Sequence, residues 1–178
     1  MKQYLLYLLQ LLLAPKQGWK DIAADGKDYE ALERRGFIPF AAIAALSVFV
    51  QMIYHPGLSP VKLLIDCVIE FGAWLIGYFL AAAVMGAYLP DLCYDEPPVR
   101  RIRVFSLCSV GLLAFMSLVK NCMPGDFAII YFLIIYLVVI MWRAADYFDV
   151  MPESVFKFTL LATACVIVPP MLMIVLLV

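Results

Sequence analysis

The sequence predicts an all-α membrane protein, a polytopic bundle of five transmembrane helices with an N-terminal amphipathic interfacial helix. Hydrophobic residues make up 66% of the 178 residues and charged residues only 15%, whereas soluble domains contain about 45 to 50% apolar residues. The apolar residues gather in five long runs, and the lysines and arginines fall almost entirely on one side of them. Together these observations exclude a water-soluble globular fold.

The chain is expected to begin with a short helix on the membrane surface. Lys2 precedes an apolar stretch at residues 4–13, and Pro15 in the first position of a mature chain argues against a cleaved signal peptide. The stretch is too short to cross a hydrocarbon core of about 30 Å. We therefore expect it to lie in the interface, with Tyr4 and Tyr7 buried there.

Residues 1–36 are read as a cytoplasmic leader, and residues 37–178 as the five-span transmembrane domain. The third and fourth runs hold 16 residues each, about 24 Å of helix, so flanking basic side chains must reach toward the headgroups. A re-entrant hairpin is the alternative for these two runs. The expected spans are 37–54, 63–88, 104–119, 127–142 and 158–178.

Positive charge predicts the orientation, because lysine and arginine stay on the cytoplasmic side of short loops. Two of these residues, Lys62 and Lys120, fall on one side and eleven on the other. The N-terminus is therefore expected in the cytoplasm and the C-terminus, after five spans, outside. The eleven are Lys2, Lys16, Lys20, Lys27, Arg34, Arg35, Arg100, Arg101, Arg103, Arg143 and Lys157.

The second run carries the most suggestive polar residues. Lys62, Asp66 and Glu70 recur at four-residue spacing and share one helix face. A charge at mid-bilayer costs about 2.5 to 3.5 kcal/mol on insertion scales, and such residues commonly mark ion or proton pathways. Alternatively, the run is longer than the hydrocarbon is thick, so its carboxylates stand in the outer headgroups. If Glu70 is buried, it is expected to pair with Lys120, and Asp66, Glu70 and Lys120 form the candidate intramembrane polar site.

Two features predict how the helices pack. Ala73, Gly77 and Ala81 form a stripe of small residues at four-residue spacing, which permits close contact with another helix of this chain or with a second copy in a homo-oligomer. Pro169 and Pro170 interrupt the last run and are expected to kink it. Broken helices of this kind occur in transporters, and kinks also occur in membrane proteins without transport activity.

The segment before the third run separates acidic from basic residues across a proline pair. Asp95 and Glu96 precede it, and Arg100, Arg101 and Arg103 follow it. Basic residues beside a span bind anionic headgroups at about 1 kcal/mol each. Membrane topology accounts for the arginines, and docking of a cytoplasmic protein partner is the alternative.

Catalytic signatures are lacking from the sequence. There is no Gly-x-Ser-x-Gly motif and no phosphate-binding glycine loop, and His55 stands alone. The five cysteines show no metal-ligand spacing and are read as apolar packing residues. Because the net charge is only −1, we expect no nucleic-acid partner. Because the motifs are missing, we also expect no enzymatic activity, no cofactor and no metal.

The stretch L-L-L-A-P-K-Q-G-W-K-D-I at residues 11–22 resembles the opening of small bacterial members of the Yip family, named for Ypt-interacting proteins. The matching residues are Pro15, Trp19 and Ile22, and the F-I-P start of the first span fits as well. The resemblance implies an all-helical five-span domain in the bacterial inner membrane. In eukaryotic relatives it implies trafficking through small GTPases, but their long N-terminal region and D-L-Y-G-P motif have no counterpart here. Pro15 is expected to end the first helix and Trp19 to lie at headgroup level, which makes the motif a membrane anchor.

Two functions follow from this architecture. The leading hypothesis is a non-catalytic membrane protein that organises or docks partners through its cytoplasmic face, formed by the leader, residues 89–103 and residues 143–157. The alternative is a small carrier or channel for an ion, small solute or lipid that uses Asp66, Glu70 and the kinked last helix. Membrane lipids are expected partners in both cases. A polar cavity between the helices would favour the carrier.

Overall fold

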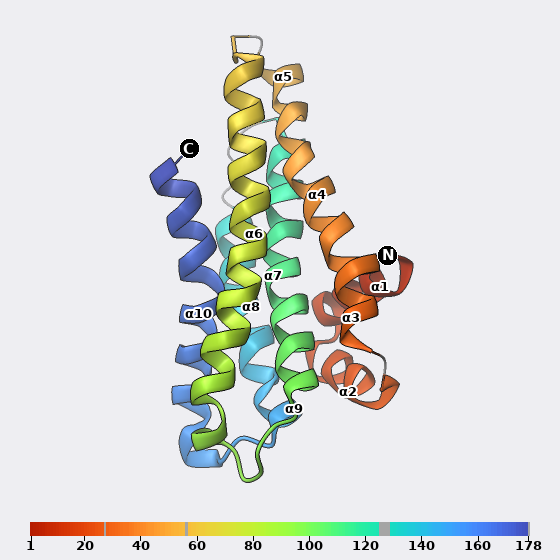
Figure 1. Cartoon of the computed structure of the whole chain (residues 1–178), viewed down its shortest axis with the longest axis vertical. Helices are drawn as coiled ribbons and strands as arrows, with labels where there is room; N and C mark the ends of the chain where they lie inside the picture. The colour runs from red at the N-terminus through yellow and green to blue at the C-terminus, as the bar shows by residue number, and fades with distance from the viewer. Residues whose placement is uncertain (27, 56, 125–128, 178) are drawn as a thin grey trace.

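A computed structural model describes residues 1–26, 28–55, 57–124 and 129–177. Within these ranges the chain is helical, apart from turns and one isolated bridge between Cys93 and Val150. Long helices lie side by side in a bundle, and the short N-terminal helices pack against its flank (Figure 1). The elements are α1 Lys2–Leu13, α2 Pro15–Asp25, α3 Tyr29–Leu32, η1 Glu33–Phe37, α4 Ile38–Leu46, η2 Ser47–Val50, α5 Gln51–Tyr54, α6 Pro60–Tyr88, η3 Pro90–Leu92, α7 Val99–Cys122, α8 Ile129–Arg143, α9 Ala145–Phe148, η4 Pro152–Ser154 and α10 Val155–Leu177.

Four helical stretches in the described ranges are long and apolar enough to cross a membrane, which is typical of a helical membrane protein. They correspond to the first, second, third and fifth predicted runs. The third run was expected to be short, but its helix has 24 residues because it begins before the arginines rather than after them. The four stretches are Tyr29–Tyr54, Pro60–Tyr88, Val99–Cys122 and Pro152–Leu177.

The fourth predicted run forms the shorter helix α8. Its 15 residues make about 22 Å of helix, less than the hydrocarbon thickness, and it is not among the four candidate spans. The first residues of the predicted run, 127 and 128, lie outside the described ranges. Helix α8 packs against both α7 and α10, inside the same bundle.

Helix α1 is held to the bundle by a buried tyrosine. The Tyr4 hydroxyl donates a hydrogen bond of 2.7 Å to the carbonyl of Leu107 in α7. Gly36 and Gly111 make room for this side chain, because a Cβ at either position would collide with it. Tyr4 and Tyr7 are therefore buried in protein contacts, whereas the sequence analysis placed them in the membrane interface.

Helix α2 contains the residues on which the Yip resemblance rests. Pro15 is its first residue, a position at which the backbone N–H that proline lacks would have no hydrogen-bond acceptor within the helix. Trp19 is only 1% exposed, and its Nε1–H donates a hydrogen bond of 2.9 Å to the carbonyl of Ile140 in α8. Ile22 is also buried. The predicted membrane-anchor role is therefore wrong for Trp19 and Ile22, since both side chains are covered by the protein and cannot reach headgroups.

The small-residue stripe of α6 lies against α10. Ala73, Gly77 and Ala81 are buried, and the ring of Pro170 lies 3.2 to 3.4 Å from the point where a Cβ on Gly77 would stand. Helix α10 continues through both of its prolines. The stripe therefore packs within the chain, as in the first of the two predicted arrangements.

Candidate functional site

Helices α6 and α7 bring a buried carboxylate and a hydroxyl together. Glu70 is only 8% exposed, and the Ser117 hydroxyl lies 3.1 Å from each of its carboxylate oxygens. The Asn121 side chain is a further hydrogen-bonding partner. Glu70 is thus enclosed between helices. Asp66, one turn away, is half-buried, and Lys62 is exposed.

The expected pairing of Glu70 with Lys120 is not formed. Lys120 lies exposed in the last turn of α7. In the described part of the chain, no ion pair within 4 Å joins it to the carboxylate. Ser117 and Asn121 already supply hydrogen bonds to Glu70, and the strongly hydrated Lys120 side chain stays exposed.

A polar network extends from this carboxylate toward the first span. The Asn121 amide donates to the Ser47 hydroxyl at 3.0 Å, and the Gln51 amide donates to Asn121 at 2.7 Å. Sequence reasoning missed Ser47, Gln51, Ser117 and Asn121. The signal for them was present, because each is a polar residue within or at the end of an apolar run.

A cavity of about 100 Å³ adjoins the carboxylate, and we call it the Glu70 cavity. Its polar lining comes from Glu70, Ser117 and Lys120, and the rest is apolar. Trp74 also lines it, and the buried Nε1–H of Trp74 has no hydrogen-bond partner among the described residues. The lining also includes Met171 in α10, directly after the proline pair. The site thus combines one buried carboxylate, apolar walls and an indole whose N–H is buried without a partner among the described residues.

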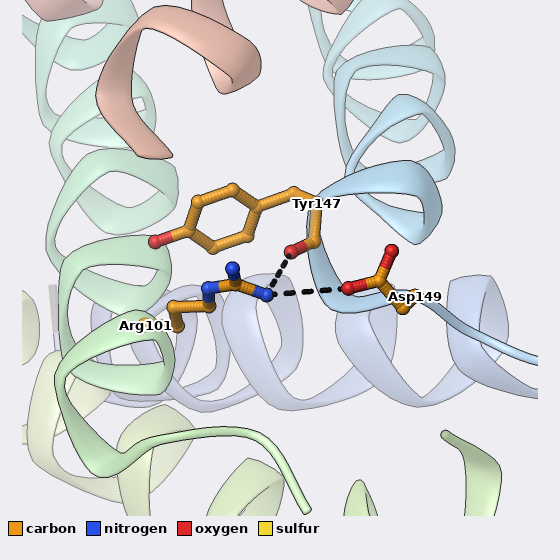
Figure 2. A network of polar contacts seen from close by, with 3 residues as sticks. All are labelled: Arg101, Tyr147 and Asp149. Atoms are coloured by element: carbon orange, nitrogen blue, oxygen red, sulfur yellow. Dashed lines mark hydrogen bonds and ion pairs between the residues drawn. The ribbon is translucent and has the colours of Figure 1, made fainter. Parts of the chain in front are cut away.

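The arginines expected to dock a partner are used inside the protein. The Arg101 guanidinium donates to the carbonyl of Tyr147 at 3.1 Å and lies 3.4 Å from a carboxylate oxygen of Asp149 (Figure 2). It also lies over the Tyr147 ring, 5.6 Å from the centroid. These contacts join the start of α7 to the end of α9, where Asp149 adopts a left-handed conformation with φ of 54°.

Arg103 has a similar internal role. Its guanidinium lies 3.4 Å from the Tyr78 hydroxyl and stacks over Tyr29 at 5.3 Å, and Tyr78 in turn donates to Glu33 at 2.7 Å. Arg101 and Arg103 thus make contacts within the protein, and docking of a partner by these arginines stays a prediction. Arg100 is half-buried and also has an internal interaction.

The acidic half of the predicted docking cluster stays at the surface. Asp95 and Glu96 are both exposed in the connection between α6 and α7. That connection is tied to the segment after α9, since Met151 donates its backbone N–H to Leu92 at 3.0 Å. Burial raises the pKa of the Cys93 thiol in the same connection, so it stays protonated at neutral pH and is a weak nucleophile.

Neither known protein families, nor curated proteins, nor solved structures match this chain. All five cysteines are free, and no group of three His, Cys, Asp or Glu residues in the described ranges is placed to hold a metal. The features that remain for a functional argument are the Glu70 cavity and the exposed acidic pair.

Proposed function

We propose that this chain is a small carrier or channel for an ion or small solute, with Glu70 in its binding site. The observation that supports this function over partner docking is a buried carboxylate that lines a cavity inside a bundle of membrane-crossing helices. An ionisable group in such a place is costly, and those that persist usually serve a substrate or ion pathway. No catalytic role is proposed.

The proposal includes five crossings, with α8 as the fourth. The described residues of α8 are strongly apolar and pack between α7 and α10. Arg143 ends the helix, so a crossing by α8 puts it on the same side as the arginines at the start of α7. By the positive-inside rule this side is cytoplasmic, with the N-terminus inside and the C-terminus outside the bacterial inner membrane.

We further propose that α1 lies in the cytoplasmic interface. Its buried side faces the bundle, but Leu6, Leu9 and Leu13 are exposed on the other side, the last of them by 84%. An apolar face of this kind on a short helix is typical of segments that insert shallowly among headgroups. The Yip resemblance of the leader remains a proposal that rests on Pro15, Trp19 and Ile22.

The carrier function is tested by measuring currents from proteoliposomes adsorbed on a solid-supported membrane. The wild-type protein is challenged with monovalent inorganic cations, small amines and neutral amino acids. We expect at least one solute to evoke a current that Glu70→Gln abolishes. Glu96→Gln makes the same chemical change at an exposed position and is expected to keep the current. Identical responses from wild type and Glu70→Gln to every solute would refute the proposal.

Partner docking on the cytoplasmic face is the second candidate. Its support is the exposed acidic pair Asp95 and Glu96, which lies beside Tyr94 and Val99, exposed by 69% and 64%. Apolar and aromatic groups next to charge are typical of protein contact surfaces. A protein that co-purifies with the wild type and is lost from a variant with Asp95→Ala and Glu96→Ala would favour this function.

A further inference from the structure

We propose that the Glu70 cavity binds a small organic ammonium ion that also carries an oxygen acceptor, with an amino alcohol such as ethanolamine as the simplest member of the class. This inference rests on the proposed carrier function and specifies its substrate. It follows from the charge of the cavity, the chemistry of its walls, the free donor of Trp74 and the available volume.

The charge of the cavity favours a cation. Glu70 is the buried charge in the lining, and half-buried Asp66 adds negative charge one turn away. Lys120 lines the cavity, but its ammonium makes no ion pair with Glu70 within 4 Å among the described residues. An ammonium ion that enters the cavity can therefore donate hydrogen bonds to a carboxylate that no internal cation has taken.

The walls favour an organic cation over a metal ion. Hard cations such as Ca²⁺ need about six to eight oxygen ligands, whereas the side chains of this lining supply oxygens only from Glu70 and Ser117. Met116 and Met171 offer polarisable thioethers, which adapt to methylene groups. The indole of Trp74 adds an aromatic surface that attracts cations.

Trp74 lines the cavity, and once its indole turns the Nε1 edge toward the guest, an acceptor there would satisfy the buried N–H, which lacks a partner within the described ranges. A buried donor without a partner is rare in folded proteins and costs free energy. A hydroxyl or ether oxygen on the guest would satisfy it while the ammonium group contacts Glu70. The volume of about 100 Å³ leaves room for a small guest such as ethanolamine.

Isothermal titration of the full-length protein in lipid nanodiscs tests the inference. Ethanolamine is the probe, ethylammonium lacks the oxygen, and potassium chloride supplies an inorganic cation. We expect saturable binding of ethanolamine, about tenfold weaker binding by Glu70→Gln and unchanged binding by Glu96→Gln. Trp74→Phe is expected to remove the preference for ethanolamine over ethylammonium, because it keeps the aromatic ring and deletes the donor.

Lys120→Gln provides a test that poor folding cannot imitate. Lys120 lines the cavity, and its positive charge repels a cationic guest, so removal of that charge is expected to strengthen ethanolamine binding several-fold. No saturable binding of either amine by the wild type, or equal affinity in wild type and Glu70→Gln, would overturn the inference. Currents from other solutes that still depend on Glu70, without amine binding, would overturn the substrate class and leave the carrier standing. Amine binding without any current would support the site and refute the carrier.

Discussion

Three aromatic side chains attach the leader to the bundle, and each donates a hydrogen bond to a backbone carbonyl. Tyr4 and Trp19 reach carbonyls of α7 and α8, and Tyr136 in α8 donates to the carbonyl of Leu12 at 2.7 Å. Each contact combines a large apolar burial with one directed polar bond, so its geometry is specific as well as stabilising. The stability of the leader should depend strongly on these residues.

Trp19→Ala is expected to lower the free energy of unfolding by about 3 to 5 kcal/mol, because it empties a fully buried site and leaves the Ile140 carbonyl without its donor. Thermal denaturation in detergent, followed by circular dichroism, measures the change. Trp142→Ala is the matched control, since Trp142 is 46% exposed and its ring lies beneath the Arg143 guanidinium. Equal effects of the two substitutions would contradict the packing role of Trp19.

Gly111→Ala is expected to detach α1, because the new Cβ would collide with the Tyr4 hydroxyl. Limited proteolysis of the leader should become faster, and the melting temperature should fall. Gly72 is a suitable control, since a Cβ there meets nothing within 4 Å. Gly72→Ala should be neutral or stabilising by up to about 1 kcal/mol, because alanine favours a helix interior. Faster proteolysis in the Gly72 variant would count against this explanation.

Sequence reasoning found part of the candidate site and missed the rest for a physical reason. Asp66 and Glu70 could be selected because their spacing lies within one helix. The partners Ser117 and Asn121 lie on a different helix. The residue pattern within one helix does not predict which turn of α7 packs against Glu70. Trp19 was placed at headgroup level for the same reason, since its burial depends on α7 and α8 folding over it.

At the scale of elements, the contact between α6 and α10 depends on a glycine opposite a proline ring. Gly77→Leu is expected to force the helices apart at Pro170 and to cost about 1 to 3 kcal/mol of stability. Gly86→Leu on the same helix has open space at its Cβ and should have little effect. Chemical denaturation of both variants measures the difference, and a comparable loss in each would show that this contact is not critical.

The helices themselves were largely predictable, because long apolar runs in a membrane have few alternatives to helix. The errors concern where helices begin. Helix α7 begins at Val99, ahead of the arginines, since Arg101 and Arg103 find partners within the protein. A prediction from composition assigns such arginines to the lipid headgroups and starts the helix after them. It has no information about partners that are distant in the sequence.

At the scale of the whole molecule, the direction of α8 decides the topology. In a variant without native cysteines, we expect Met123→Cys to react with a membrane-impermeant maleimide in intact spheroplasts and Glu153→Cys to react only after lysis. Both parent residues are exposed and lie on either side of α8. Leu177→Cys should react from outside. Labelling of positions 123 and 153 from the same side would show that α8 does not cross.

The leader contacts also constrain the order of biosynthesis. Tyr4 bonds to a residue 103 positions later in the chain, and Trp19 to one 121 positions later. The ribosome therefore releases the leader long before either acceptor exists, and its aromatic side chains must wait without their final partners until most of the polypeptide has been inserted. The leader can therefore pack against the bundle only after the C-terminal half has been synthesised. In nascent chains stalled before α8, the leader would stay accessible to chaperones and proteases.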